Sequence, residues 1–147
     1  MSISAEDHVS IQRLMYRYAR CADTRDYAGF AMVFCEDAVF DFMGNEVTPY
    51  GAIEQMMHAL DKYTATLHQV QNVFYEVDGD SAEGETYCVA SHLFYDEDGT
   101  SKIDMGIVYR DRLHRGAEGW RIARRVFDLL WTQTTPVDDP GTVSGKS

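Results

Sequence analysis

The order of hydrophobic and polar positions divides the chain into a helical first part and a β-rich second part. Apolar residues recur every three or four positions over 11–22, which predicts an amphipathic first helix, and Ser4 followed by Asp7 is a capping signal for its start. The polar stretch 23–26 predicts a break, after which apolar spacing over 27–34 indicates a short second helix. The first part of the chain is therefore expected to be mostly helical.

Further along, the apolar period changes from that of a helix to that of a strand. We predict a strand over 38–42, a loop over 44–49 and a third helix over 51–63. A period of two then predicts four long strands, near 66–77, 83–95, 102–113 and 119–131. Three helices followed by a meander predict an α+β domain over 1–134, with the helices on one face of a curved, mostly antiparallel sheet. Residues 135–147 have no apolar period and predict a flexible C-terminal tail, or an arm that contacts another subunit.

Two histidines occupy related positions on the first two long strands. If 79–81 form a three-residue loop, His68 lies directly opposite His92, and opposed residues share a face with Cβ atoms about 5 Å apart. A slip of one residue would instead put the two rings on opposite faces. Because Asp23 ends the first predicted helix, the pattern predicts two imidazoles and a carboxylate on one concave wall.

The same counting, continued through the next two turns, predicts which other side chains share that face. It pairs Met105 with His92 and Tyr109 with Arg125. If the last strand slips by one residue, Arg124 takes the place of Arg125, so both arginines remain candidates. The predicted wall is apolar with a few polar groups, as small-molecule pockets usually are, and it also includes Val70, Asn72, Phe74, Cys88, Ala90, Ile107, Ala123 and Phe127.

Charge and composition exclude several classes of partner. The net charge of −11 repels phosphate backbones and argues against DNA or RNA as a partner. Three cysteines without C-x-x-C spacing argue against a disulfide framework or a structural zinc site. The first residues contain no basic segment followed by an apolar stretch, and no apolar run approaches the length that spans a membrane. We therefore expect a soluble, cytoplasmic protein without a membrane partner.

Five ordered stretches carry a family resemblance. They read IQRLMY, CADTRD, YGAI, TLHQVQN and GWRI, and begin at residues 11, 21, 50, 66 and 119. Each is weak alone, but the ordered set resembles the SnoaL-like family of the nuclear transport factor 2-like superfamily over about residues 5–131. This resemblance implies a cone-shaped α+β half-barrel with an internal pocket, commonly in a homodimer or higher homo-oligomer.

Within that superfamily the chain most resembles small cofactor-free lyases, namely the scytalone dehydratases, hexachlorocyclohexane dehydrochlorinases and bile acid 7α-dehydratases. Such enzymes pair an aspartate at the end of the first helix with a histidine early in a long strand, and Asp23 and His68 match that pair. His92 matches a second histidine of the scytalone dehydratases. Tyr18 matches a tyrosine of the bile acid enzymes, and Arg125 an arginine of the dehydrochlorinases. The resemblance implies that Asp23, His68 and His92 are catalytic.

Departures from the family pattern limit what the resemblance implies. Phe42 stands where scytalone dehydratases have a pocket tyrosine, and Tyr109 lies near one of their polar positions, so we expect a different substrate. The residues expected to bind that substrate are Tyr18, Phe42, Asn72, Tyr109 and Arg125. The same fold also hosts isomerases, cyclases, hydrolases and non-catalytic subunits.

The expected chemistry is proton abstraction. A neutral imidazole accepts a proton at physiological pH, and a carboxylate bonded to one ring nitrogen fixes its tautomer. We therefore expect Asp23 to orient His68, and His68 to take a proton from carbon in an apolar, cyclic small molecule. A dehydration or isomerisation of this kind needs neither cofactor nor metal. Three alternatives remain: a metal site with two histidines and one aspartate, a non-catalytic accessory subunit like that of ring-hydroxylating dioxygenases, and a polyketide or steroid-type cyclase.

Structural roles for the same residues also remain open. Asp23 is a good cap for a second helix, and a strand histidine such as His92 is often a purely structural residue. Tyr18 and Asp23 are five residues apart, which is a rotation of about 140° along a helix. Both therefore reach one pocket only if the helix ends before Asp23.

Overall fold

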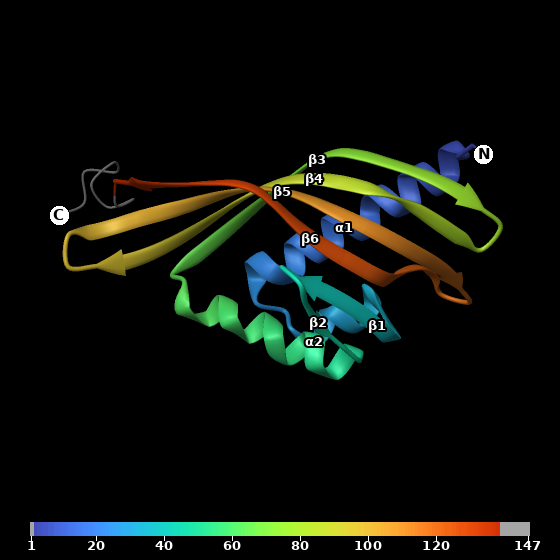
Figure 1. Ribbon diagram of the computed structural model, residues 1–147, viewed down its shortest axis with the longest axis horizontal. Helices are drawn as coiled ribbons and strands as arrows, with labels where there is room; N and C mark the ends of the chain where they lie inside the picture. Colours follow the sequence, from blue (N-terminus) through green and yellow to red (C-terminus); the bar gives the residue numbers. More distant parts are fainter. Residues whose placement is uncertain (1, 139–147) are drawn as a thin grey trace.

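The computed structural model describes residues 2–138 of the 147-residue chain as helices packed on a six-stranded open sheet (Figure 1). The helical elements are α1 (Ala5–Thr24), the 3₁₀ helix η1 (Ala28–Met32), α2 (Tyr50–Met57) and the 3₁₀ helix η2 (His58–Lys62). The strands are β1 (Phe34–Phe42), β2 (Asn45–Val47), β3 (Ala65–Asp78), β4 (Ser81–Asp96), β5 (Gly99–Gly116) and β6 (Gly119–Pro136). Their order is β2-β1-β6-β5-β4-β3, and among these described strands only the β1–β6 pair is parallel. The predicted α+β class is confirmed.

Helix α1 begins and ends where the sequence predicts. The Ser4 side chain accepts a hydrogen bond from the Asp7 amide at 3.0 Å. At the other end, Arg25 adopts φ 58° in the left-handed region, and its backbone N–H caps the last turn. The helix packs along β3 through a buried stripe that comprises Ile11, Leu14, Met15, Tyr18, Ala19, Cys21 and Ala22. Asp23 therefore lies in its last turn.

The two later helices are shorter than predicted. The second is only the five-residue η1, because β1 already begins at Phe34 and Gly29, the second residue of η1, disfavours an α-helix. The third is α2, which continues as the 3₁₀ helix η2 rather than as α-helix to residue 63. The predicted loop over 44–49 contains β2, whose three residues are too few to show a period. Within residues 2–138, two α-helices rather than three therefore cover the sheet.

The register of the first long hairpin differs from the prediction but keeps both histidines on one face. Its loop has two residues rather than three, and a bulge follows at 70–73. His68 consequently pairs with Ala90, and His92 pairs with Thr66. The shorter loop and the bulge each shift the pairing by one residue, which makes a shift of two residues in all. Because side chains along a strand alternate between the two faces, a shift of two leaves His68 and His92 on the same face, as diagonal neighbours.

The bulge in β3 overturns the prediction for Asn72 and Phe74. A bulge inserts an extra residue and so reverses which side chains face inward beyond it. Asn72 and Phe74 are exposed, and Tyr75 is buried in their place. The prediction that Asn72 lies on the pocket face is therefore wrong.

In the last hairpin, the pairing of β5 with β6 differs by two residues from the prediction. Each side chain therefore stays on the face of the sheet that was predicted for it. Arg125 pairs with Asp111 rather than with Tyr109. Arg125 is 1% exposed, whereas Arg124 lies on the outer side and contacts Glu46. Arg125, not Arg124, is therefore the arginine of the inner face.

The C-terminal strand is longer than predicted. Strand β6 includes Thr135 and Pro136, the first two residues of the predicted tail. Residues 137 and 138 are described without helix or strand, and the rest of that prediction, over 139–147, lies outside the described residues. Within 2–138, no helix has both the length and the apolar character needed to cross a membrane.

Candidate active site

A hollow of about 190 Å³ lies between the helices and the inner face of the sheet. Its lining is mainly aromatic and aliphatic, with contributions from α1, β1, α2, η2 and the four long strands. The polar side chains in the lining are Tyr18, Lys62, Tyr63, His68, His92 and Tyr109. An apolar hollow with a few convergent polar groups is the usual form of a small-molecule site.

Asp23 and His68 form a hydrogen-bonded pair at one wall of this hollow. His68 Nδ1 lies 2.7 Å from Asp23 Oδ1, and the His68 amide donates to Oδ2 at 2.9 Å. Burial opposes ionisation of Asp23, but the hydrogen bonds from the His68 ring and amide hold the pKa of Asp23 below its usual value. Because an ionised carboxylate only accepts hydrogen bonds, Nδ1 of the neutral His68 ring carries the proton. The lone pair is then on Nε2.

Helix α1 places Asp23 behind His68 rather than in the hollow. The helix continues through Thr24, so Tyr18 and Asp23 point in different directions from it. Tyr18 lines the hollow, whereas Asp23 lines an open groove between α1 and β3. His68 borders both spaces. The carboxylate therefore reaches the ring from the solvent side.

His92 lies beside His68 in the wall of the hollow, with ring centroids 5.6 Å apart. Burial, together with the nearby His68 ring, lowers the pKa of His92 to about 4, so its ring is neutral at physiological pH. Its Nδ1 is buried and has no hydrogen-bond partner among the described residues. Such an atom calls for a partner, which a bound molecule or a water can supply.

Arg125 and Asp111 form a second acid–base pair, buried behind the hollow. Arg125 Nε and Nη2 donate to the two Asp111 oxygens at 2.8 and 2.7 Å, and the side chains are 1% and 0% exposed. The Tyr75 hydroxyl also donates to Asp111, at 2.6 Å. Burial disfavours the charged guanidinium, but the paired carboxylate raises the pKa of Arg125 above its usual value. The arginine is therefore permanently charged and neutralised by its partner.

Two tyrosines separate Arg125 from the hollow. The guanidinium carbon lies 4.4 Å from the ring centroid of Tyr18 and 4.1 Å from that of Tyr109. Burial raises the pKa of both phenols, that of Tyr109 well above its usual value, so both hydroxyls stay protonated. Arg125 itself does not line the hollow. The rings of Tyr18 and Tyr109, rather than the Arg125 side chain predicted to bind substrate, face the hollow.

Other predicted residues divide between the hollow and the surface. Phe42 lines the hollow as predicted, whereas Asn72 lies outside it. Asp111 and Thr66 lie behind the hollow and contact Arg125 and Asp23, respectively, although neither stands out in the sequence. Asp111 becomes recognisable only when the register pairs it with Arg125. Thr66 lies two residues before His68, so strand alternation is the signal that would have identified it.

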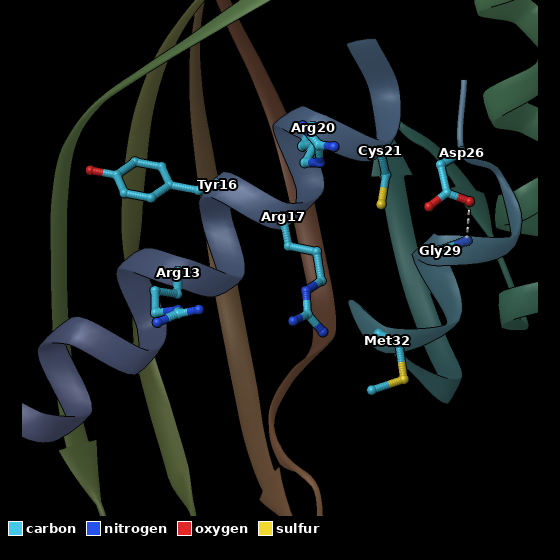
Figure 2. A pocket seen from close by; sticks show the side chains of 8 residues that line it. All are labelled: Arg13, Tyr16, Arg17, Arg20, Cys21, Asp26, Gly29 and Met32. Carbon is cyan, nitrogen blue, oxygen red and sulfur yellow. Dashed lines mark hydrogen bonds between the residues drawn. The ribbon is translucent and has the colours of Figure 1, made fainter. Parts of the chain in front are cut away.

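A larger groove of about 660 Å³ lies outside, between α1 and η1 (Figure 2). Arg13, Arg17 and Arg20 lie along the α1 side of this groove, and Met32 lies across from them. The groove does not include His68 or Asp23, so the aromatic hollow is the better candidate for the active site. Within residues 2–138, no three His, Cys, Asp or Glu side chains are grouped so as to hold a metal ion.

A match to a known family accompanies this geometry. Residues 4–126 match the model of the SnoaL-like domain. The chain belongs to this SnoaL-like family. Over 123 residues it is 31% identical to an uncharacterised protein of Mycobacterium tuberculosis, a match that covers 82% of this chain and 83% of that protein.

Several solved structures share the fold of this chain. A putative aromatic ring hydroxylase from Novosphingobium aromaticivorans is 26% identical, with a TM-score of 0.80 over 91% of this chain and 96% of that chain. A putative scytalone dehydratase from the same organism is 20% identical, with a TM-score of 0.76 over 88% and 87%. A type 2 hexachlorocyclohexane dehydrochlorinase is 18% identical, with a TM-score of 0.79 over 90% and 93%. At identities below 25%, the last two likenesses show a shared fold alone.

Proposed function

We propose that this protein is a cofactor-independent lyase or isomerase in which the Asp23–His68 pair abstracts a proton from carbon. The single observation that carries the proposal is the 2.7 Å hydrogen bond between Asp23 and His68 at the wall of an aromatic hollow. Asp23 holds the proton of His68 on Nδ1, which leaves Nε2 as the basic atom for a bound molecule. A base positioned in this way contributes about 10²–10⁴ to the rate.

The proposed reaction balances with His68 as the only group that changes its protonation state. His68 Nε2 takes a proton from carbon beside an activating group, and the negative charge of Asp23 stabilises the imidazolium that forms. In a dehydration, the imidazolium then protonates the departing hydroxyl, giving an alkene and water. In an isomerisation, it returns the proton to another carbon. Both outcomes restore the starting enzyme.

His92, Tyr18 and Tyr109 supply hydrogen bonds rather than protons in this scheme. The pKa of His92, about 4, keeps its ring neutral, and the raised pKa values of the two tyrosines keep their hydroxyls protonated. Neutral donors of this kind stabilise an enolate oxygen as it gains charge. The Arg125 guanidinium lies behind the two phenols and packs on both rings, with its charge matched by Asp111.

The size of the hollow limits the substrate. Its 190 Å³ exceeds the roughly 150 Å³ of a cavity that holds benzene, and is smaller than the roughly 300–1,000 Å³ of sites for drug-sized ligands. We propose a neutral substrate with one ring or two fused rings. A four-ring steroid would not fit without movement of the walls.

We further propose that the protein acts in the cytoplasm as a homodimer or higher homo-oligomer. Phe74, opposite Glu85, and Tyr87 share the outer face of the sheet, and the two aromatic side chains are 66% and 37% exposed. Apolar side chains of this size on one face are suited to contact with a second copy. Sedimentation analysis tests this directly, and a Phe74→Glu variant is expected to shift the protein toward monomer.

The test of the proposed function is hydrogen exchange at carbon. Small ketones with one or two rings are incubated with the protein in D₂O, binding is detected by ligand NMR, and deuterium incorporation beside the carbonyl is followed by mass spectrometry. For at least one ketone that binds, we expect exchange to be about 10²–10⁴ faster with the natural protein than with the His68→Gln variant. Equal exchange rates for every ketone that binds would contradict the proposal.

A second candidate function has one observation in its favour. The neighbour with 26% identity and a TM-score of 0.80 is described as a putative aromatic ring hydroxylase. By analogy, this chain would be an accessory subunit that binds a small aromatic molecule without transforming it. Ketones that bind in the hollow without exchange, together with co-purification of a larger iron-bearing chain, would favour this function over catalysis.

A further inference from the structure

The carboxylate of Asp23 is held by more than the histidine it contacts. The Thr66 hydroxyl donates to Asp23 Oδ1 at 3.0 Å, and Arg25 Nη1 donates to the Thr66 oxygen at 2.8 Å. Thr66 is 7% exposed, so water competes little for this hydroxyl. Arg25, Thr66, Asp23 and His68 therefore form one continuous chain of hydrogen bonds that ends at the proposed base.

The direction of these hydrogen bonds is fixed by their chemistry. A guanidinium only donates, so the Thr66 oxygen is the acceptor from Arg25. An ionised carboxylate only accepts, so the Thr66 hydrogen points to Asp23. With Thr66 and the His68 amide as donors, Asp23 has one orientation in which Oδ1 faces the His68 ring. The arrangement permits only the Nδ1–H tautomer of neutral His68.

The backbone at Arg25 supports a specific role for this side chain. Arg25 adopts φ 58° and ψ 31° at the end of α1, in the left-handed region. Glycine is the usual residue in that conformation after a helix, and other residues adopt it at a cost in free energy. The same side chain also donates to the carbonyls of Ala22 and Tyr63, at 2.6 and 3.5 Å. This conformation turns the guanidinium toward β3, where it contacts Thr66.

We propose that Arg25 and Thr66 are positioning residues that hold Asp23 in the orientation that keeps His68 as the Nδ1–H tautomer. The inference rests on the proposed function, because it assigns a task to residues behind the proposed base. Neither residue lines the hollow, so neither touches a substrate there. Without the hydroxyl of Thr66, the carboxylate gains freedom to rotate, and His68 gains access to the tautomer with its proton on Nε2. That tautomer has no lone pair to accept a proton from a molecule in the hollow.

The test is the tautomer of His68, read from the ¹⁵N chemical shifts of its ring. The chain has 5 histidines, and loss of one set of signals in the His68→Gln variant assigns the signals of interest. In the natural protein we expect Nδ1–H to dominate at neutral pH. In Thr66→Val we expect the Nε2–H form to appear, and in Thr66→Ser, which keeps the hydroxyl, we expect the natural pattern to return.

Matched controls separate this role from a general loss of packing. Thr64 lies two residues earlier, and its exposed hydroxyl donates to the Leu93 carbonyl at 3.3 Å, so Thr64→Val is expected to leave the His68 tautomer unchanged. Arg25→Gly is expected to change the tautomer as Thr66→Val does, even though glycine suits the left-handed backbone. Met43→Gly relieves the other positive non-glycine φ, 54°, and is expected to leave the tautomer unchanged.

The same variants give a second readout in the ketone exchange assay. Because small displacements of catalytic groups cost about a hundredfold in rate, we expect Thr66→Val and Arg25→Gly to slow exchange by about that factor. Thr66→Ser is expected to stay within a few-fold of the natural protein. An Nδ1–H population in both Thr66→Val and Arg25→Gly equal to that of the natural protein would overturn the proposal. A changed tautomer in a protein that catalyses no exchange would instead support the positioning role and count against the proposed function.

Discussion

Two pairs of a carboxylate and a basic side chain, of contrasting design, lie around the hollow of this protein. Arg125 and Asp111 are 1% and 0% exposed, and they meet through two hydrogen bonds with no contact to the hollow. His68 and Asp23 are 6% and 21% exposed, and His68 borders both the hollow and an outer groove. Tyrosines separate the Arg125–Asp111 pair from the hollow, whereas the His68–Asp23 pair lies between the hollow and the outer groove.

This contrast separates a structural pair from a candidate for chemistry. The Arg125 charge is matched by Asp111, and the raised pKa of the guanidinium prevents it from giving up a proton. In the second pair, Asp23 engages only one nitrogen of the ring and leaves the other for a bound molecule. A group that must exchange protons needs such an open side, whereas a group that stabilises the fold is better enclosed.

The largest expected effect on stability comes from breaking the sealed pair. Asp111→Ala leaves the Arg125 charge buried without a partner, which typically costs about 3–5 kcal/mol of unfolding free energy. The measurement is urea unfolding followed by tryptophan fluorescence. As a control, Arg124→Ala removes contacts of an arginine that is 32% exposed, and it is expected to cost less than about 1 kcal/mol. Equal losses of unfolding free energy in Asp111→Ala and Arg124→Ala would contradict the proposed difference between the buried pair and an exposed one.

Acid is expected to destabilise the fold through His92. Its pKa is about 4 in the folded protein and 6.5 ordinarily, so between these values the unfolded chain binds more protons than the folded one. The contribution of His92 to the unfolding free energy is therefore fully present above pH 6.5. It falls by up to about 3 kcal/mol as the pH is lowered toward 4. The lowered pKa of Asp23 adds a further loss at still lower pH. Unfolding free energies measured from pH 7 to pH 4 test this expectation.

Two variants identify the source of this acid sensitivity. His92→Gln is expected to flatten the dependence of unfolding free energy on pH between 6.5 and 4, because the buried titrating ring is gone. His114→Gln removes an exposed histidine and is expected to leave the dependence unchanged. If His92→Gln had the same dependence of unfolding free energy on pH as the natural protein, another group would be the main source of the acid sensitivity.

The smallest expected effect on stability comes from the open pair. His68→Gln removes one hydrogen bond to Asp23, while the Thr66 hydroxyl and the residue 68 amide still hold the carboxylate. The expected loss of unfolding free energy is about 1 kcal/mol. His58→Gln, which removes an exposed contact with Asp61, serves as the matched control. A loss as large as that of Asp111→Ala would mean that the His68 pair is chiefly structural.

Most of the fold could be predicted from the hydrophobic pattern because its long elements repeat one period many times. The 20-residue α1 and the strands of 14 to 18 residues were all recognisable in this way. The three-residue β2 and the five-residue η1 contain too few residues for a period, and local turn chemistry decides their form.

The site was predictable wherever only the face of a strand mattered. His68 and His92 share a face because the loop and the bulge together shift the register by two residues. The bulge at 70–73 could not be read from the sequence, and it turned Asn72 outward and Tyr75 inward. Asp111 escaped notice because its role depends on which residue of β6 lies opposite, and turn counting placed that register two residues away.

The most direct measurement is a crystal structure of the protein with a bound ketone of one or two rings. We expect density for the ketone in the aromatic hollow, with the carbon beside its carbonyl within about 3–3.5 Å of His68 Nε2 and the carbonyl oxygen facing His92, Tyr18 or Tyr109. A ketone bound with that carbon remote from His68, or held only in the arginine-lined groove outside α1, would contradict it.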